Sequence, residues 1–371
     1  MPLFMDRHDV SPTVTAEIVA QLHHEDLKIQ HLFNCRGLTY WFDEKRKTAF
    51  CLVEAPNAKS IRDMHRKAHG DVPNQIIEVE ADLVESFLGR IEDPSHSAGI
   101  GLNIINDPAF RIIMTVRLVK TGFPGLDTAA GTAGSENIQN VIGRTLKKSE
   151  GSIVKHNNRE FLVSFKSMKM ALSTSLKIYT LAKMLPNCSP VRIGLSAGMP
   201  FLKKGTMFED AVKLSKRLCD IQTDKIMISS ELNDLIKQEN GLRRLSHRDL
   251  FSNYTVADEQ ILCQLMDFME SAYTNANLTV DDISRFLGIS KSKLYHKIET
   301  LTGKSLNRFI KEYRLNEAIT LLEKNAHTIS EIAYETGFTS LSYFSKCFEK
   351  KYARRPSVVK NSIASSANTP G

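Results

Sequence analysis

The stretch LTVDDISRFLGISKSKLYHKIETLTG, from Leu278 to Gly303, decides how the C-terminal quarter of the chain folds. A second stretch of the same kind, TISEIAYETGFTSLSYFSKCFEKKY, runs from Thr328 to Tyr352. Each begins with apolar residues at helical spacing and reaches a glycine that can close a turn, then an apolar residue and a hydroxyl residue suited to cap the next helix. The turn residues are Gly288 with Ser290, and Gly337 with Thr339. The pattern predicts two helix-turn-helix units joined by one long amphipathic helix.

The second helix of each predicted unit keeps polar and basic residues on its outward face. Between Arg285 and Lys360 there are fifteen Lys and Arg against seven Asp and Glu, an excess that attracts a polyanion. Such helices suit the DNA major groove, with lysines and helix N-termini at phosphates. The alternative is an ordinary helical bundle with solvated lysines, which the tandem pattern disfavours. The candidate DNA-binding residues are Ser290, Lys291, Ser292, Lys293, His296, Lys297, Thr339, Ser340, Ser342, Tyr343, Lys346 and Lys350.

Residues 261–360 resemble the DNA-binding domain of AraC/XylS-type transcription factors. The resemblance rests on Leu294, Gly303, Arg314, Leu315, Ala318, Leu322, Ile332-Ala333, Gly337-Phe338, Tyr343-Phe344, Phe348, Tyr352 and Pro356-Ser357. It implies two small helical subdomains joined by a linker helix, with two recognition helices in successive major-groove segments. Ala353 departs from the family, which usually has glycine there. Because that helix end needs left-handed backbone, we expect Ala353 to cost about 1 kcal/mol of stability.

Composition bounds the rest of the chain. Its 371 residues predict two to four domains, and its net charge of +7 is no larger than the excess at the C-terminal end. Six scattered cysteines without a Cys-x-x-Cys pair favour free thiols in a reducing cytoplasm. No apolar run approaches the roughly 20 residues that span a bilayer, so we expect no membrane partner.

Residues 1–93 read as β-α-β-β-α-β, the order of a ferredoxin-like sandwich. His65 and His69 stand at i, i+4 on one predicted helix, a workable spacing for metal ligands. Alternatively, the two are solvated or hydrogen-bonded near a helix end. The segment resembles a small family of ferredoxin-like domains with a nickel-binding branch, on the residues Phe4-Met5-Asp6-Arg7-His8, Thr39–Asp43, Ala49–Pro56, His65 and Ala68-His69-Gly70. The candidate metal ligands are His8, His65 and His69, and imidazoles favour nickel, copper or zinc over magnesium. The resemblance itself does not assign a ligand set residue by residue.

After a predicted linker at 94–109, residues 110–240 again read as β-α-β-β-α-β with additions at the end, a second ferredoxin-like sandwich. This unit resembles the catalytic domain of class III nucleotide cyclases. The matching residues are Phe161–Phe165, Val191-Arg192-Ile193-Gly194-Leu195, Gly198, Asp210-Ala211-Val212, Leu214, Arg217, Leu218 and Ile228-Ser229.

The residues expected to carry cyclase chemistry are changed. The resemblance places Arg117 and Arg159 where the family has its two metal-binding aspartates, and Lys213 where it has an asparagine, while Arg217 is kept. Arginine stays charged and does not ligate a cation, so we expect a degenerate cyclase without enzyme activity. Arg117, Arg159, Lys213 and Arg217 could together form an anion pocket; the alternative is that they are salt-bridged or solvated replacements.

The sequence as a whole predicts a multidomain chain, α+β followed by all-α. A connector at 241–255 leads to the DNA-binding domain at 256–360, and a Ser/Ala/Asn-rich tail at 361–371 is predicted to be disordered. The leading hypothesis is a cytoplasmic, homodimeric regulator that binds double-stranded promoter DNA and has RNA polymerase as a further partner. The alternatives are an active nucleotide cyclase with a DNA-binding tail and a metal-responsive, nickel-type regulator.

Overall fold

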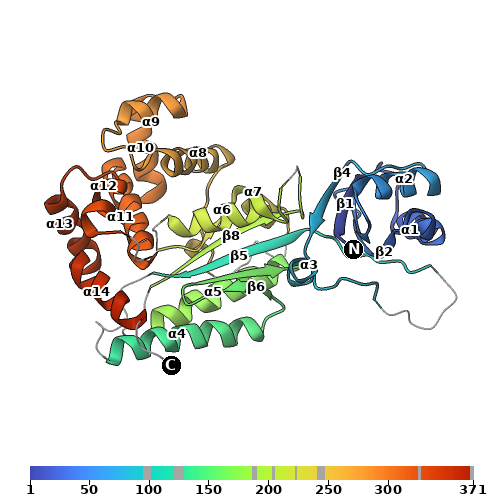
Figure 1. Cartoon of the computed structure of the whole chain (residues 1–371), viewed down its shortest axis with the longest axis horizontal. Helices are drawn as coiled ribbons and strands as arrows, with labels where there is room; N and C mark the ends of the chain where they lie inside the picture. Colours follow the sequence, from blue (N-terminus) through green and yellow to red (C-terminus); the bar gives the residue numbers. More distant parts are fainter. Residues whose placement is uncertain are drawn as a thin grey trace.

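The computed structural model describes residues 1–94, 102–119, 129–185, 190–202, 205–221, 224–239, 247–324 and 327–367. Three parts follow one another along the long axis of the molecule: a small sheet with helices, a larger sheet with helices, and a group of helices at the far end (Figure 1). This agrees with the prediction that regions with both strands and helices are followed by an all-α region. Among the described helices none is long and apolar enough to cross a membrane.

The first part has the predicted element order. Its elements are β1 (Leu3–Asp9), α1 (Ala16–Ile29), a 3₁₀ turn (Gln30–Phe33), β2 (Arg36–Asp43), β3 (Thr48–Glu54), α2 (Ala58–Ala68), β4 (Gln75–Val79) and α3 (Ala81–Leu88). The strands pair antiparallel in the order β2-β3-β1-β4. Because strand side chains alternate between faces, Phe4 packs with α1 and α2, whereas Met5 faces away from them.

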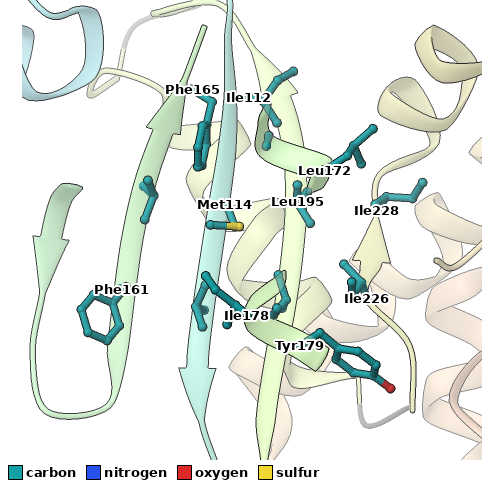
Figure 2. Packing of buried hydrophobic residues seen from close by; sticks show 14 of the residues in the cluster. Ile112, Met114, Phe161, Phe165, Leu172, Ile178, Tyr179, Leu195, Ile226 and Ile228 are labelled. Atoms are coloured by element: carbon teal, nitrogen blue, oxygen red, sulfur yellow. The ribbon is translucent and has the colours of Figure 1, made fainter. Parts of the chain in front are cut away.

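The second part is a five-stranded sheet in the order β6-β7-β5-β8-β9, in which only the last described pair is parallel. Its elements are β5 (Arg111–Leu118), α4 (Ala129–Lys147), β6 (Ser152–His156), β7 (Glu160–Phe165), α5 (Met168–Met184), β8 (Val191–Gly198), α6 (Glu209–Asp220), β9 (Met227–Ile228), α7 (Ser230–Gln238) and a 3₁₀ turn (Arg248–Leu250). Figure 2 shows Met114 and Leu195 of the sheet facing Leu172 and Ile178 of α5. On the other face α6 lies close to β8, since a Cβ on Gly194 would stand 2.1 Å from the Ser215 carbonyl oxygen.

The two sheets share one core. Trp41, Phe50 and Leu52 from the first sheet pack in a single cluster with Ile113 and Leu162 from the second. The cluster also takes in α3, through Val84, Phe87 and Leu88. The first sheet is therefore buried on both faces, and its position relative to the second is fixed by apolar packing.

The third part is helical. It consists of α8 (Val256–Ala272), α9 (Val280–Leu287), α10 (Lys291–Thr302), α11 (Leu306–Lys324), α12 (Ile329–Glu335), α13 (Leu341–Tyr352) and α14 (Pro356–Ala367). One core joins α8, α9 and α10, and another joins α12, α13 and α14. The long helix α11 contributes Phe309 and Ile310 to the first core and Leu315 and Leu322 to the second. It is the predicted linker helix.

Two expectations about this chain need correction. Residues 361–367, predicted to be part of a disordered tail, continue α14. Val359 is fully buried and the Ser362 hydroxyl donates to the Val359 carbonyl oxygen, so the helix is anchored before the alanines, which favour helix, extend it. The Gly-, Pro- and Thr-rich sequence from Gly122 to Gly134 predicts a loop, followed by a helix from Ser135, whereas α4 begins earlier, at Ala129. The rest of the predicted glycine-rich loop, the first half of the connector and residues 368–371 lie outside the described residues.

Candidate nucleic-acid interface and histidine cluster

The first helix-turn-helix unit is closed at each end by its own sequence. Thr279 and Asp282 form a capping box at the start of α9, and α9 ends at Gly288 with φ of 63°. The Ser290 hydroxyl then accepts from the Lys293 N–H at 3.3 Å and caps α10. These local signals fix the turn and leave the N-terminal residues of α10 on the outside.

The second unit repeats this arrangement with one difference. Thr328 and Glu331 form a capping box on α12, and Gly337 has φ of 78°. The residue that caps α13 is Ser340, whose hydroxyl accepts from the Tyr343 N–H at 3.3 Å. The prediction of Thr339 at this position was wrong by one residue, because this turn holds one residue more than the first before its helix begins.

Most of the predicted DNA-binding residues are exposed together on these two helices. In the first unit Ser290, Lys291, Ser292, Lys293 and His296 are exposed, and in the second Thr339, Ser342, Tyr343, Lys346 and Lys350. Ser340 is half-buried as a cap. Lys297 differs from the expectation of an outward residue, since it is half-buried and its Nζ lies 2.6 Å from Asp258 Oδ1 of α8. Lys291 pairs with exposed Asp281 at 2.6 Å.

The packed sides of the two helices face inward. Leu294 and Ile298 fill the first core, and Phe344 and Phe348 fill the second. Leu301, at the end of α10, contacts the middle part of the chain instead, in a cluster with Leu218 and other apolar residues. The candidate interface thus packs on these cores, and within the part of the chain that the structure describes its polar faces stay exposed.

A separate cluster of titratable groups is buried between β1, α1 and α2. Asp6 and His8 alternate along β1 and both point toward the helices, where His65 Nε2 lies 3.0 Å from Asp6 Oδ2. The other ring nitrogen of His65, Nδ1, is 3.0 Å from Asp26 Oδ2 of α1. His69 follows His65 by one helical turn, and its Nε2 lies 3.2 Å from His65 Nδ1.

In this cluster, the histidines and carboxylates stabilise each other's charged forms. Burial disfavours a charged imidazole, but hydrogen bonds to Asp26 and Asp6 outweigh it and raise the pKa of His65 to about 10. Burial would raise the pKa of the Asp6 carboxyl, yet His8 and His65 hold that pKa well below its usual range. The cluster is accordingly built around a charged histidine between two carboxylates.

Two groups in this cluster have ligand atoms close enough to hold a metal ion: Asp6 with His8 and Cys51, and Asp26 with His65 and His69. The predicted set of His8, His65 and His69 is therefore divided between two adjacent groups. The sequence analysis did not identify Asp6, Asp26 and Cys51 as candidate ligands. For Asp6 a signal was present, because Asp6 and His8 are two residues apart on one strand and therefore lie on the same face. Buried His8 Nε2 and Asp26 Oδ1 lack a well-formed hydrogen bond within the described structure.

Comparison with known proteins bears on both ends of the chain. The sequence profile described as a helix-turn-helix domain matches residues 283–362, and the profile described as nickel responsive protein SCO4226-like matches residues 4–79. The chain carries an AraC-type helix-turn-helix domain and an SCO4226-like domain. Residues 80–282 lie between these matches, and the cyclase resemblance there stays a prediction.

Individual relatives share only parts of the chain. A histidine kinase P4 of Formosa agariphila is 42% identical over 104 residues, 28% of this chain and 8% of that protein. An uncharacterised HTH-type transcriptional regulator of Pseudoalteromonas carrageenovora is 31% identical over 100 residues, 27% of this chain and 58% of that protein. The crystal structure of SCO4226 from Streptomyces coelicolor covers 21% of this chain and 94% of its own, at 31% identity and a TM-score of 0.20.

The four cations predicted to form an anion pocket between them are paired with carboxylates. Arg117 pairs with Glu160 and Asp220, while Lys213 and Arg217 pair with Asp267 of the helical part. Arg159 pairs with Glu323 of α11, in the AraC-type domain, and does not line the cavity that the other three share. The expectation of one pocket formed by all four is therefore wrong, because Arg159 follows a turn that carries it to the linker helix.

Sequence reasoning missed the cations that do line this cavity beside Arg117, Lys213 and Arg217. Arg192 comes from β8, Lys216 from α6, Lys304 from the loop after α10, and Lys351 from the last turn of α13. No local pattern marks them, since they come from segments far apart in the sequence. They meet only where the AraC-type domain packs on the middle sheet.

Proposed function

We propose that this protein is a cytoplasmic, sequence-specific regulator of transcription that binds promoter DNA through α10 and α13. The observation that carries the proposal is the pair of helices with matching caps, both exposed along their basic faces and both braced by α11. Side chains at the start of each helix would reach base edges, and lysines and helix N-termini would meet phosphates. The similarity to an HTH-type transcriptional regulator of Pseudoalteromonas carrageenovora supports the same activity here.

The test is binding to genomic DNA fragments. Occupied sites should share a motif that spans two adjacent major-groove segments, and affinity should fall by roughly 10³–10⁵ between 50 and 200 mM salt if about six to ten phosphates are contacted. Replacing Lys293, His296 or Lys346 should weaken discrimination among sequences by about 1–3 kcal/mol. Equal losses on every sequence for all three variants would contradict the base-reading assignment.

We infer that both sheets are ferredoxin-like sandwiches and that the second is a degenerate cyclase-like domain without enzyme activity. In each sheet the first strand lies between the third and the fourth, an arrangement that suits a β-α-β-β-α-β unit. The predicted division at 1–93, 110–240 and 256–360 goes with this interpretation, and a homodimer with RNA polymerase as a partner goes with the regulator. Metal-dependent formation of a cyclic nucleotide from ATP or GTP by the purified chain would refute the inactive assignment.

A second candidate function, metal response, is favoured by the histidine cluster. Its donor set of imidazole, carboxylate and thiol suits nickel, copper or zinc. His8 Nε2 and Asp26 Oδ1 form no hydrogen bond in the described structure and have only contacts of 3.3 Å, with Asp6 and His69. We propose that Asp26, His65 and His69 hold such an ion, which would replace the proton on His65 Nδ1, with Asp6 orienting His65 through its hydrogen bond to Nε2. An ion bound there would tie α1 to α2.

Equilibrium dialysis with nickel, copper and zinc tests the metal proposal. We expect wild type to bind one of these ions and His65→Ala/His69→Ala to lose it, while His24→Ala, at an exposed histidine of α1, retains it. Asp6→Asn should weaken binding about 10–100-fold, as expected for a residue that supports a ligand. Equal binding by wild type and the double variant would remove the candidate.

A further inference from the structure

A cavity of about 440 Å³ lies between the middle sheet and the AraC-type domain. Strands β5 and β8 and helix α6 form one wall; α8, α11 and α13 form the other. Its volume lies within the range of about 300–1,000 Å³ typical of small-molecule sites. Seven cationic and four anionic side chains line it, together with the rings of Tyr273, Phe309 and Tyr313.

Most of the cations in the cavity wall are neutralised by carboxylates. Arg117 and Lys216 share Glu160, Lys213 and Arg217 share Asp267, and Lys304 pairs with Glu312 at 2.5 Å. Of these pairs, the two with Asp267 link α6 to α8. They offer little net charge to a ligand, because each cation already has a counter-ion.

Arg192 and Lys351 are different. Within the part of the chain that the structure describes, the guanidinium of Arg192 forms no hydrogen bond or ion pair, and the residue is half-buried. The Lys351 ammonium contacts two neutral oxygens, the Glu312 carbonyl at 2.9 Å and Asn316 Oδ1 at 2.6 Å. Burial, reinforced by the charges of Arg192 and Lys304 against that of Glu312, lowers the pKa of Lys351 to about 7. Two basic side chains from different parts of the chain thus line one cavity, and neither forms an ion pair in the described structure.

We propose that this cavity binds a small organic phosphate, with the phosphate between Arg192 and Lys351 and a planar ring against the aromatic wall. A phosphate dianion matches two cations, and the guanidinium fork can donate to two of its oxygens. Tyr273, Phe309 and Tyr313 supply an apolar surface against which a planar ring can pack. Arg192 and Lys351 alone would bind a phosphate without favouring an attached ring. A bound anion would also offset the repulsion between the two cations.

The position of the site gives the ligand a role, and this step rests on the proposed regulator function. Arg192 belongs to β8, whereas Lys351 belongs to the last turn of α13, the recognition helix of the second unit. A phosphate held by both would tie that helix to the middle sheet. We therefore expect the ligand to change affinity for DNA by restricting how the second unit is oriented.

Calorimetry on the full chain without DNA tests the site. The probes are adenosine 5′-monophosphate, inorganic phosphate and adenosine. We expect the monophosphate to bind more tightly than phosphate, and adenosine not to bind. Arg192→Gln and Lys351→Gln should each lower the affinity for the monophosphate at least tenfold. The matched controls Arg144→Gln and Lys177→Gln, at exposed positions of α4 and α5, should leave it unchanged.

Each other outcome would overturn the proposal. These are no binding by wild type, a monophosphate that binds no more tightly than phosphate, and cavity variants that bind as wild type does. If the affinity for the monophosphate fell in Lys293→Gln but not in Arg192→Gln, the anion would be binding at the DNA-facing surface instead. Misfolding is excluded if ligand-free Arg192→Gln and Lys351→Gln melt at or above the wild-type temperature, as expected when an uncompensated cation is removed. DNA binding measured without probe tests the regulator function separately.

Discussion

Ala353 ends α13 in the left-handed region, with φ of 54°, as the sequence predicted. A Cβ is strained in this conformation and glycine is not. We therefore predict that Ala353→Gly raises the free energy of unfolding by about 1 kcal/mol. Chemical denaturation measures the gain. The same substitution inside a helix, Ala182→Gly in α5, should lower the free energy of unfolding by about 0.5–1 kcal/mol; a loss at both positions would contradict the strain at Ala353.

The two turn glycines are a matched pair. Both have positive φ, 63° at Gly288 and 78° at Gly337, so an alanine at either is strained by about 1 kcal/mol. A Cβ at Gly288 meets nothing within 4 Å, whereas one at Gly337 would stand 2.3 Å from the Tyr273 carbonyl oxygen and 2.9 Å from the Arg314 side chain. Arg314 donates to that same carbonyl, so the clash would separate the two units.

We predict that Gly288→Ala destabilises by about 1 kcal/mol and that Gly337→Ala destabilises by about 1–3 kcal/mol more. Gly337→Ala should also weaken binding to a two-groove DNA site more than binding to a half site, because it disturbs the contact between the units. Denaturation and DNA titration of both variants measure this. Equal effects of the two substitutions would show that the contact to Tyr273 contributes nothing.

Residue-level predictions succeeded where the cause was local. The left-handed backbone at Gly288 and Ala353 follows from helix-end chemistry within a few residues. The partners of Lys297 and of the candidate ligands in the first part are distant in sequence. Asp258 reaches Lys297 from α8, and Asp6 and His65 are brought together from a strand and a helix. Periodicity assigns a residue to a face but does not say which element lies opposite.

At the scale of elements, α10 shows how a neighbouring helix can give two lysines on one helix face different environments. Lys293 is exposed, whereas Lys297 is paired with Asp258, which also serves the capping box of α8. On α13 the exposed Lys350 is free to meet a phosphate.

We predict that Lys297→Ala leaves DNA affinity and its salt dependence unchanged and costs at most about 1 kcal/mol of stability. Lys350→Ala should weaken binding to all sequences and reduce the salt slope by about one. Titration of one specific and one unrelated duplex at several salt concentrations measures both. A reduced salt slope in Lys297→Ala would mean that its pair with Asp258 opens on DNA.

Element boundaries were predicted best where a cap or a hairpin turn marks them. The sequence predicts strands at Ser152–His156 and Glu160–Phe165 and a helix at Met168–Met184. Strands β6 and β7 and helix α5 have these limits, since Asn157 side-chain bonds close the hairpin and Ser167 caps the helix. The end of α14 was mistaken for a disordered tail because composition was read without packing. Val359 anchors that helix through contacts with α12 and α13 that the tail's own composition does not encode.

At the scale of the whole molecule, the AraC-type domain is held against the middle part by a small apolar cluster with ion pairs around it. Leu301 packs with Leu218, Ile221 and Met227 of the middle part, and the Tyr254 hydroxyl donates to the Leu301 carbonyl oxygen at 2.5 Å. The pairs between Arg217 and α8 are partly exposed, so they contribute less than the apolar contact. Loss of Leu301 should therefore undock the domain before it unfolds it.

We predict that Leu301→Ala costs about 2–5 kcal/mol, mostly at this contact, and resolves the unfolding of the AraC-type domain from that of the sheets as two calorimetric transitions. Affinity for a specific duplex should stay within a few fold of wild type, because α10 and α13 keep their own cores. Leu294→Ala is the matched control: the same side chain is removed from the centre of the first unit, so specific binding should be lost. A single unshifted transition in Leu301→Ala would show that the cluster does not hold the parts together. Loss of DNA binding in Leu301→Ala with the domain still folded would mean that the middle sheet sets the orientation of the recognition helices even without a ligand.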